Sequence, residues 1–113
     1  MKNIGDLHHN GRAGFAKDQV EALKWYRRAA DSGHGDSINM VGIYYQLGWG
    51  ELTKDEMEAV RLYRLASEKG SAAGRVSLSR LYWNGTLGVE KNAAEAVKLL
   101  RLAANQGNAN AQN

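Results

Sequence analysis

The stretch EALKWYRRAADSG at residues 21–33 returns twice in nearly the same form, as EAVRLYRLASEKG at 58–70 and as EAVKLLRLAANQG at 95–107. Each copy begins 37 residues after the previous one, with no gap between copies. A fixed period of this length is the signature of a repeat protein, in which each copy is one structural unit. We therefore expect a single domain over residues 1–113, made of repeats 1–37, 38–74 and 75–111.

Each copy of this stretch has the signals of a helix with defined ends. A good N-cap residue is followed three residues later by Glu, which is the capping-box pattern. The three N-caps are Asp18, Asp55 and Asn92, and the three glutamates are Glu21, Glu58 and Glu95. A glycine suited to the left-handed position after a helix follows each copy, and these glycines are Gly33, Gly70 and Gly107. Apolar residues recur at helical spacing between these signals, for example Met57, Val60, Leu62, Tyr63 and Ala66.

A second helix is expected before this one in every repeat. It covers about 35–47 in the second copy, about 72–84 in the third and about ten residues in the first, ending at Gly48, Gly85 and Gly11. The loop after it always ends on an apolar residue that we interpret as a plug under the helix pair: Phe15, Leu52 or Val89. One helical hairpin cannot bury its apolar face alone, whereas stacked hairpins can. The sequence therefore predicts an all-α fold, a right-handed α-solenoid of three antiparallel helix-turn-helix repeats.

These residues resemble the Sel-one-like repeat, a relative of the tetratricopeptide repeat. The resemblance is carried by VGIYYQLGWGELTKDEMEAVRLYRLASEKG at 41–70, by LSRLYWNGTLGVEKNAAEAVKLLRLAANQG at 78–107 and by the first copy at 4–33. Leu62 and Leu99 stand where the family pattern has the Trp kept at Trp25, which we interpret as core replacements. The resemblance implies an interaction scaffold or adaptor and no shared catalytic residue.

Composition excludes several classes of protein and of site. There is no Cys, so disulfides and thiolate metal sites are excluded. The net charge of +3 comes without a basic run, which argues against a nucleic-acid partner. No segment approaches the length of an apolar membrane span, so no membrane insertion is expected. The opening MKNIGDLHHNG has no apolar region, so no signal peptide is expected; the compartment is left open, with the cytoplasm favoured.

Catalytic and metal-binding patterns are not found in the sequence. There is no P-loop, HExxH or nucleophile elbow, and the adjacent His8 and His9 point about 100° apart on a helix. The recurring arginines Arg27, Arg64 and Arg101 form either an anion-binding ladder or, as we favour, a solvated face with charge pairs along one helix. We predict no enzyme, no cofactor and no metal. A β-lactamase-type enzyme of the cell envelope, which the resemblance offers as an alternative, is disfavoured because such members are rich in Cys.

The predicted binding site is an apolar patch on the first helix of the second repeat. Met40, Ile43 and Leu47 are apolar where the other copies have polar residues, and their spacing places them on one helix face. The polar or aromatic flanks are Asp6, His9, Arg80 and Trp83. We expect these residues to bind a peptide or a partner helix in a concave groove, because an apolar patch with a polar rim is typical of such sites. The alternative is that the patch packs against the neighbouring repeat; Trp49 is either a loop plug or an exposed contact.

The last helix has apolar residues around most of its circumference. They are Val97, Leu99, Leu100 and Leu102. Because solenoids need a polar outer face at their ends, we hypothesise that this end pairs with a second copy of the chain, as a homodimer, or with further repeats. A purely structural role, as a piece of a longer array without a ligand of its own, is the remaining alternative.

Overall fold

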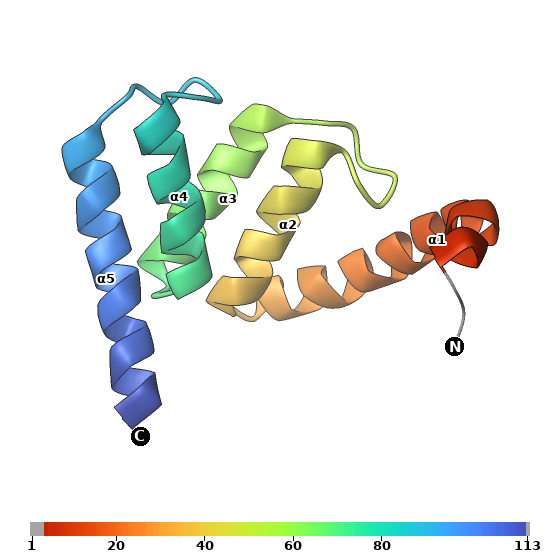
Figure 1. Ribbon diagram of the computed structural model, residues 1–113, viewed down its shortest axis with the longest axis horizontal. Coiled ribbons are helices and arrows are strands. Elements are labelled where there is room, and N and C mark those ends of the chain that lie inside the picture. The colour runs from red at the N-terminus through yellow and green to blue at the C-terminus, as the bar shows by residue number, and fades with distance from the viewer. Residues whose placement is uncertain (1–3, 113) are drawn as a thin grey trace.

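The chain folds into a row of α-helices joined by short connections (Figure 1). The computed structural model describes the backbone of residues 4–112 and the side chains of residues 18–106. Its five helices are α1 (Ile4–Asp31), α2 (Gly35–Leu47), α3 (Glu56–Glu68), α4 (Ala72–Asn84) and α5 (Ala93–Gln112). All regular secondary structure in this described part is helical, which confirms the predicted all-α solenoid.

Successive helices run in alternate directions and pack on one another in chain order, as Figure 1 shows. In addition, α2 packs directly against α4. The pairs α2–α3 and α4–α5 are the predicted hairpins, whereas α1–α2 and α3–α4 are the contacts between repeats. Helices α2, α3 and α4 are therefore covered by neighbours on both sides of the row, whereas α5 packs against α4 alone.

The hydrophobic core consists of two clusters that follow the repeats. The first core cluster joins α1, α2 and α3 and contains Leu23, Ile38, Val41, Tyr44, Leu62 and Ala66. The second core cluster joins α3, α4 and α5 and contains Ala59, Tyr63, Leu78, Leu81, Val89 and Leu99. The predicted loop plugs belong to these clusters: Val89 is buried, and the partly buried Leu52 packs on the first. Phe15 lies outside the described side chains.

Most of the predicted helix ends are confirmed. The helices α2 and α4 have the expected bounds, and both end at a glycine in the left-handed conformation, with φ of 69° at Gly48 and 66° at Gly85. Asp55 caps α3 by accepting a hydrogen bond from the backbone N–H of Glu58 at 3.1 Å. Asn92 accepts from the N–H of Glu95 at the same distance.

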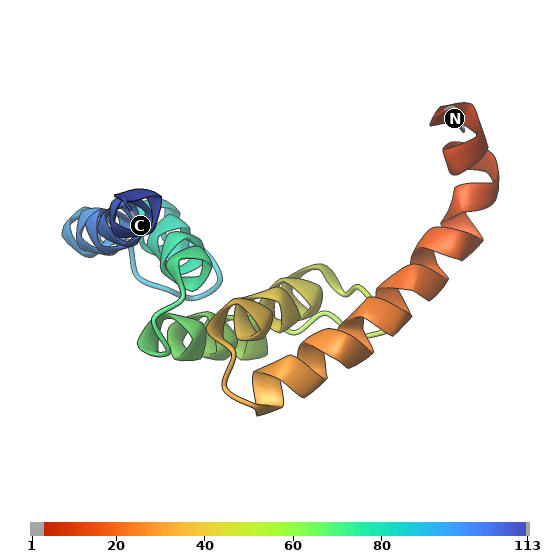
Figure 2. The same cartoon turned by 90° about the horizontal axis from the view of Figure 1, so that it is seen from below.

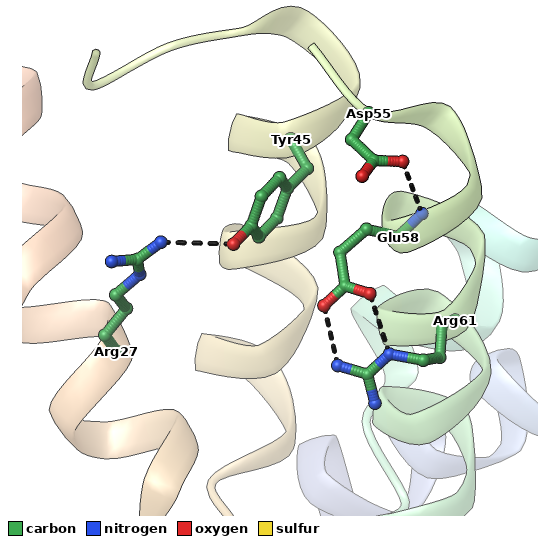
Figure 3. A network of polar contacts seen from close by, with 5 residues as sticks. All are labelled: Arg27, Tyr45, Asp55, Glu58 and Arg61. Atoms are coloured by element: carbon green, nitrogen blue, oxygen red, sulfur yellow. Dashed lines mark hydrogen bonds and ion pairs between the residues drawn. The ribbon is translucent and has the colours of Figure 1, made fainter. Parts of the chain in front are cut away.

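The reciprocal half of the capping box is not formed at Asp55, as the close view in Figure 3 shows. The Glu58 carboxylate accepts two hydrogen bonds from Arg61 instead, at 2.9 and 2.7 Å. The backbone N–H of Asp55 donates to the carbonyl of Tyr45 in α2 at 2.9 Å, and Asn92 donates in the same way to Tyr82 at 2.8 Å. The N-cap is thus tied to the preceding helix, which closes each hairpin.

The first repeat does not form the predicted hairpin. A single helix, α1, runs through Gly11 and through Asp18, so neither residue marks a helix end (Figure 2). In the later repeats the first helix packs on a preceding helix, α2 on α1 and α4 on α3. Residues 4–10 have no preceding helix in the described chain on which to pack, so the contact that positions the first helix of the later repeats is missing here.

Two further expectations about the repeated helix are wrong. Gly107 does not end α5, which continues to Gln112. Met57 was expected among the core residues of α3, yet 84% of its surface is exposed. It lies on the same face of α3 as Arg61 and Arg64, which are also exposed.

Candidate functional site

A pocket of about 350 Å³ lies between α2 and α4, with α3 beneath it. We call it the α2/α4 pocket. The helix α2 contributes Ile43, Gln46 and Leu47; α4 contributes Ser77, Arg80, Leu81 and Asn84; Tyr63 of α3 and Thr86 of the following loop complete the lining. The pocket exists because first helices of adjacent repeats pack side by side, so their exposed faces form one concave surface.

Tyr63 belongs to the lining of this pocket, although only 2% of its surface is exposed. Its ring fits because α2 has a glycine opposite it: a Cβ at Gly42 would lie 2.9 Å from Cε1 of Tyr63. The hydroxyl donates a hydrogen bond to Oε1 of Gln46 at 2.5 Å. Burial raises the pKa of Tyr63 to about 12, although the nearby Arg80 opposes the rise, so the phenol is neutral at physiological pH.

The structure brings together three of the residues predicted for the binding site. Ile43, Leu47 and Arg80 line the α2/α4 pocket, and Leu47 is 48% exposed. Met40 packs instead against the first core cluster, and Ile43 packs against the second as well as lining the pocket, as the alternative interpretation of the patch expected. Gln46, Tyr63 and Asn84 also line the pocket and were not predicted as site residues, since none of them is an apolar exception in its repeat position.

Trp83 does not face the α2/α4 pocket. It lines a different pocket of about 430 Å³ between α4 and α5, which we call the α4/α5 pocket, and it is 54% exposed. Arg80 lines both pockets. The side chains of Asp6 and His9 lie outside the described residues, so their place in the site stays a prediction.

The recurring arginines make contacts between repeats that were not predicted. Arg27 of α1 donates a hydrogen bond to the hydroxyl of Tyr45 in α2 at 3.1 Å (Figure 3). Arg64 of α3 donates to the hydroxyl of Tyr82 in α4 at 3.2 Å and lies over its ring, 5.9 Å from the centroid. Both arginines are exposed, as expected of a solvated face, but their hydrogen bonds go to tyrosines of the next helix and, among the described residues, neither forms the expected charge pair along its own helix. The signal was present in the sequence, because Arg and Tyr recur with the same period.

Two tryptophans outside the pockets also have defined surroundings. Trp49, 37% exposed, packs edge-on against Tyr44 with ring centroids 5.6 Å apart, so it is both a contact of the loop and a surface residue. Trp25 is 61% exposed and lies under the guanidinium of Arg28, 5.2 Å from the ring centroid. It is therefore not a core residue, unlike Leu62 and Leu99 at the equivalent positions.

The described residues contain no group of three or more His, Asp or Glu side chains that could hold a metal ion. Within the same part of the chain, no helix combines the length and the apolar character needed to cross a lipid bilayer. The polar groups of the α2/α4 pocket are amide, hydroxyl and guanidinium groups, which can bind a ligand by hydrogen bonds and charge.

Residues 1–34, 35–71 and 72–108 each match the sequence profile of the Sel1 repeat. None of the curated proteins compared with the chain matches it.

The solved structures similar to this one include those of two proteins. The first is a Sel1 repeat protein from Oxalobacter formigenes, with a TM-score of 0.69 and 28% sequence identity over 77% of this chain. The second is a protective antigen present in uropathogenic Escherichia coli strains and displaying an SLR fold, with a TM-score of 0.67 and 33% identity over 78% of this chain. The chain covers 34% of the length of the first protein and 18% of the second.

Proposed function

The chain belongs to the Sel1 repeat family, and from this premise we propose that it is a non-catalytic scaffold that binds an extended peptide in the α2/α4 pocket. Proteins of this family are generally protein-interaction scaffolds. The choice of pocket rests on one observation: Ile43 and Leu47, which are apolar where the other repeats have polar residues, and Arg80, a predicted polar flank, lie around one concavity.

The lining of the α2/α4 pocket suits a peptide better than an apolar small molecule. Apolar side chains from α2 lie opposite polar side chains from α4, so the surface offers both burial and hydrogen bonds. Specific protein interfaces combine these two features, with apolar anchors at the centre and polar groups around them. An extended segment can place an apolar side chain against Leu47 while its backbone amides reach Gln46 and Asn84.

Arg80 determines the charge of the proposed ligand. Among the described residues, no carboxylate forms an ion pair with its guanidinium. Guanidinium groups bind carboxylates through two parallel hydrogen bonds, and Arg is enriched at binding hot spots. The proposed ligand is therefore a peptide with an Asp, a Glu or a C-terminal carboxylate next to an apolar residue.

The proposal can be tested by selecting peptides from a displayed random library on the wild-type chain and titrating the best one by fluorescence anisotropy. We expect Leu47→Asp to weaken binding at least tenfold, because it places a like charge beside the proposed ligand carboxylate and removes an apolar contact. Arg80→Gln should weaken binding of a carboxylate-bearing peptide by roughly a tenfold factor, as loss of a charge-assisted hydrogen bond does.

Met57→Asp is the matched control for this experiment. It makes the same kind of apolar-to-acidic change at a residue that is 84% exposed and lines neither pocket. Binding by Met57→Asp should equal that of the wild type. Equal affinity of Leu47→Asp and the wild type for every selected peptide would remove the α2/α4 pocket from consideration.

A further inference from the structure

The outer side of α1 carries a surface that no described helix covers. Among the described helices α1 packs against α2 alone, and Figure 2 shows it at one edge of the molecule. A hollow of about 350 Å³ on this side is lined by five residues of α1: Glu21, Lys24, Trp25, Arg27 and Arg28. We call it the Trp25 surface. It shares no residue with the α2/α4 pocket or with the α4/α5 pocket.

Trp25 and Arg28 are the two residues of this surface that depart from the repeat, because both stand where the second and third repeats have leucine. Leu62 and Leu99 are 7% and 6% exposed, whereas Trp25 is 61% exposed. The need for a polar end of the solenoid explains Arg28, but it does not explain an exposed indole, which adds apolar surface to that end. The two departures lie one helical turn apart and touch, since the guanidinium of Arg28 lies over the Trp25 ring.

Both arginines of the Trp25 surface are held by uncharged groups. Arg27 donates a hydrogen bond to the hydroxyl of Tyr45 at 3.1 Å, and Arg28 lies 5.2 Å from the centroid of the indole. Asp31 follows both arginines at a spacing that permits an ion pair within the helix. Among the described residues, neither guanidinium forms an ion pair. Both groups are therefore kept in place without neutralisation of their charge.

The other two charges of the surface cancel each other. Glu21 and Lys24 form an ion pair with 3.6 Å between Oε2 and Nζ, and both side chains are largely exposed. Three cations and one carboxylate leave two positive charges in excess beside an apolar ring. Guanidinium groups bind carboxylates through two parallel hydrogen bonds, and Trp and Arg are enriched at binding hot spots. A ligand that complements this surface has both an apolar side chain and negative charge.

We propose that the Trp25 surface binds an acidic segment of a second partner protein. The segment places an aliphatic or aromatic side chain on the exposed part of Trp25, and carboxylates on either side of it accept hydrogen bonds from Arg27 and Arg28. Arg27 keeps further N–H donors besides the one that contacts Tyr45. With one ligand in the α2/α4 pocket and another on α1, the scaffold holds two proteins at once. The Trp25 surface does not depend on the peptide site, because the two lie on different helices.

The probe for this proposal is a synthetic peptide with one phenylalanine between two pairs of glutamates, and the control peptide has glutamines in their place. Each is titrated into the isotope-labelled wild type and into Leu47→Asp, in which the proposed peptide site is disabled. The chain has three tryptophans, so a proton–nitrogen correlation spectrum has three indole N–H signals, and Trp25→Phe identifies the signal of Trp25. We expect the acidic probe to shift this signal saturably in both proteins and to leave those of Trp49 and Trp83 unmoved. The control peptide should bind at least tenfold more weakly, and failure of the peptide site would not alter these results.

Arg28→Leu installs the residue that the other repeats have at this position. It should weaken binding of the acidic probe by about tenfold, as loss of a charge-assisted hydrogen bond does. Arg101→Leu is the matched control, because it removes the same charge from an exposed position of α5. This control should bind the probe like the wild type. Circular dichroism of both variants should match the wild type, since both side chains are exposed.

Several outcomes would overturn the proposal. The acidic probe leaves the Trp25 signal unmoved, or Arg28→Leu binds the probe as tightly as the wild type. Equal weakening by Arg28→Leu and Arg101→Leu would show that net charge alone accounts for binding. A larger shift with a heparin fragment or anionic lipid vesicles than with the peptide would assign the surface to a polyanion. Slow exchange of the Trp25 indole N–H with water in the free wild type would show that another segment of the chain covers this surface.

Discussion

Helices α3 and α5 have equivalent positions in the repeat, yet they meet different surroundings. Tyr63 on α3 is 2% exposed beneath α2 and α4, whereas Leu100, at the equivalent position of α5, is 44% exposed. Val60 and Val97 differ in the same direction, partly buried on α3 and 38% exposed on α5. The same repeat pattern thus yields a core on one helix and an open surface on the other. Whether the next helix is present decides the outcome.

The largest expected effect is the difference in unfolding free energy between an alanine substitution at Tyr63 and one at Leu100. Tyr63→Ala should lower the free energy of unfolding by about 3–5 kcal/mol, because it leaves a cavity in the second core cluster and an unsatisfied Gln46 amide. Leu100→Ala should cost about 1 kcal/mol or less, since the side chain is largely in solvent. Urea unfolding followed by circular dichroism measures both. Equal losses would mean that α5 is covered in solution, and the comparison would fail.

A smaller loss of folding stability is expected at alkaline pH, because the phenol of Tyr63 on α3 can lose its proton. Leu100, at the equivalent position of α5, has no group that titrates. The pKa of Tyr63 is raised from 10.0 to about 12 by burial, so the folded state favours the neutral phenol. The stabilising contribution is complete below pH 10 and is lost as the pH rises through the folded pKa. The total loss of unfolding free energy across this pH range is about 2–3 kcal/mol for a pKa shift of this size. Urea unfolding at a series of pH values between 9 and about 12 should show this loss.

Tyr63→Phe is the control for the alkaline experiment, because it keeps the ring and removes the titrating group. This variant should lose less stability than the wild type over the same range. Absorbance at the phenolate band should also show late titration in the wild type that is reduced in the variant; some remains because burial, aided by Tyr26, also raises the pKa of Tyr44. If all five tyrosines of the wild type ionised together near the ordinary value, Tyr63 would not be buried as described.

The smallest expected effect concerns one partly exposed glutamate in the first turn of each helix, Glu58 on α3 and Glu95 on α5. The pKa of Glu58 is lowered mainly by the hydrogen bond that its carboxylate accepts from Arg61. Burial acts in the opposite direction, and the positive charge of Arg61 lowers the pKa further. Because the folded pKa is lowered, the contribution is present above the ordinary value of 4.5 and is lost as the pH falls through the folded pKa. Glu58→Gln should therefore cost about 0.5 kcal/mol or less at pH 7, as is typical of exposed pairs.

Glu95→Gln on α5 provides the counterpart of this change. No ion pair of Glu95 is found among the described residues, so its replacement should have no measurable effect on thermal unfolding. Both variants should unfold like the wild type near pH 3. A loss at Glu58 that persists at this pH would show that the glutamate acts through packing and not through its charge.

The recurrence of one pattern made much of the fold predictable. The bounds of α2 and α4, the left-handed glycines after them and the caps at Asp55 and Asn92 follow from local backbone chemistry, which a helix end needs wherever it occurs. The candidate site was predictable only in part. Ile43 and Leu47 stood out by comparison of the repeats and Arg80 was expected beside them, but nothing local placed Trp83 on the other side of α4.

The sequence by itself determined the period, the helical class and the positions that could be buried, because helix caps and apolar spacing act over a few residues. Only the tertiary structure decided which of these positions are buried. Residues 4–10 belong to the single long helix α1 and form no separate first helix. Trp25 is exposed where Leu62 is buried, and the outer face of α5 is open where that of α3 is covered. The physical reason is that a repeat buries its apolar face only against its neighbours, so identical local signals give different results at the ends and in the middle of the row.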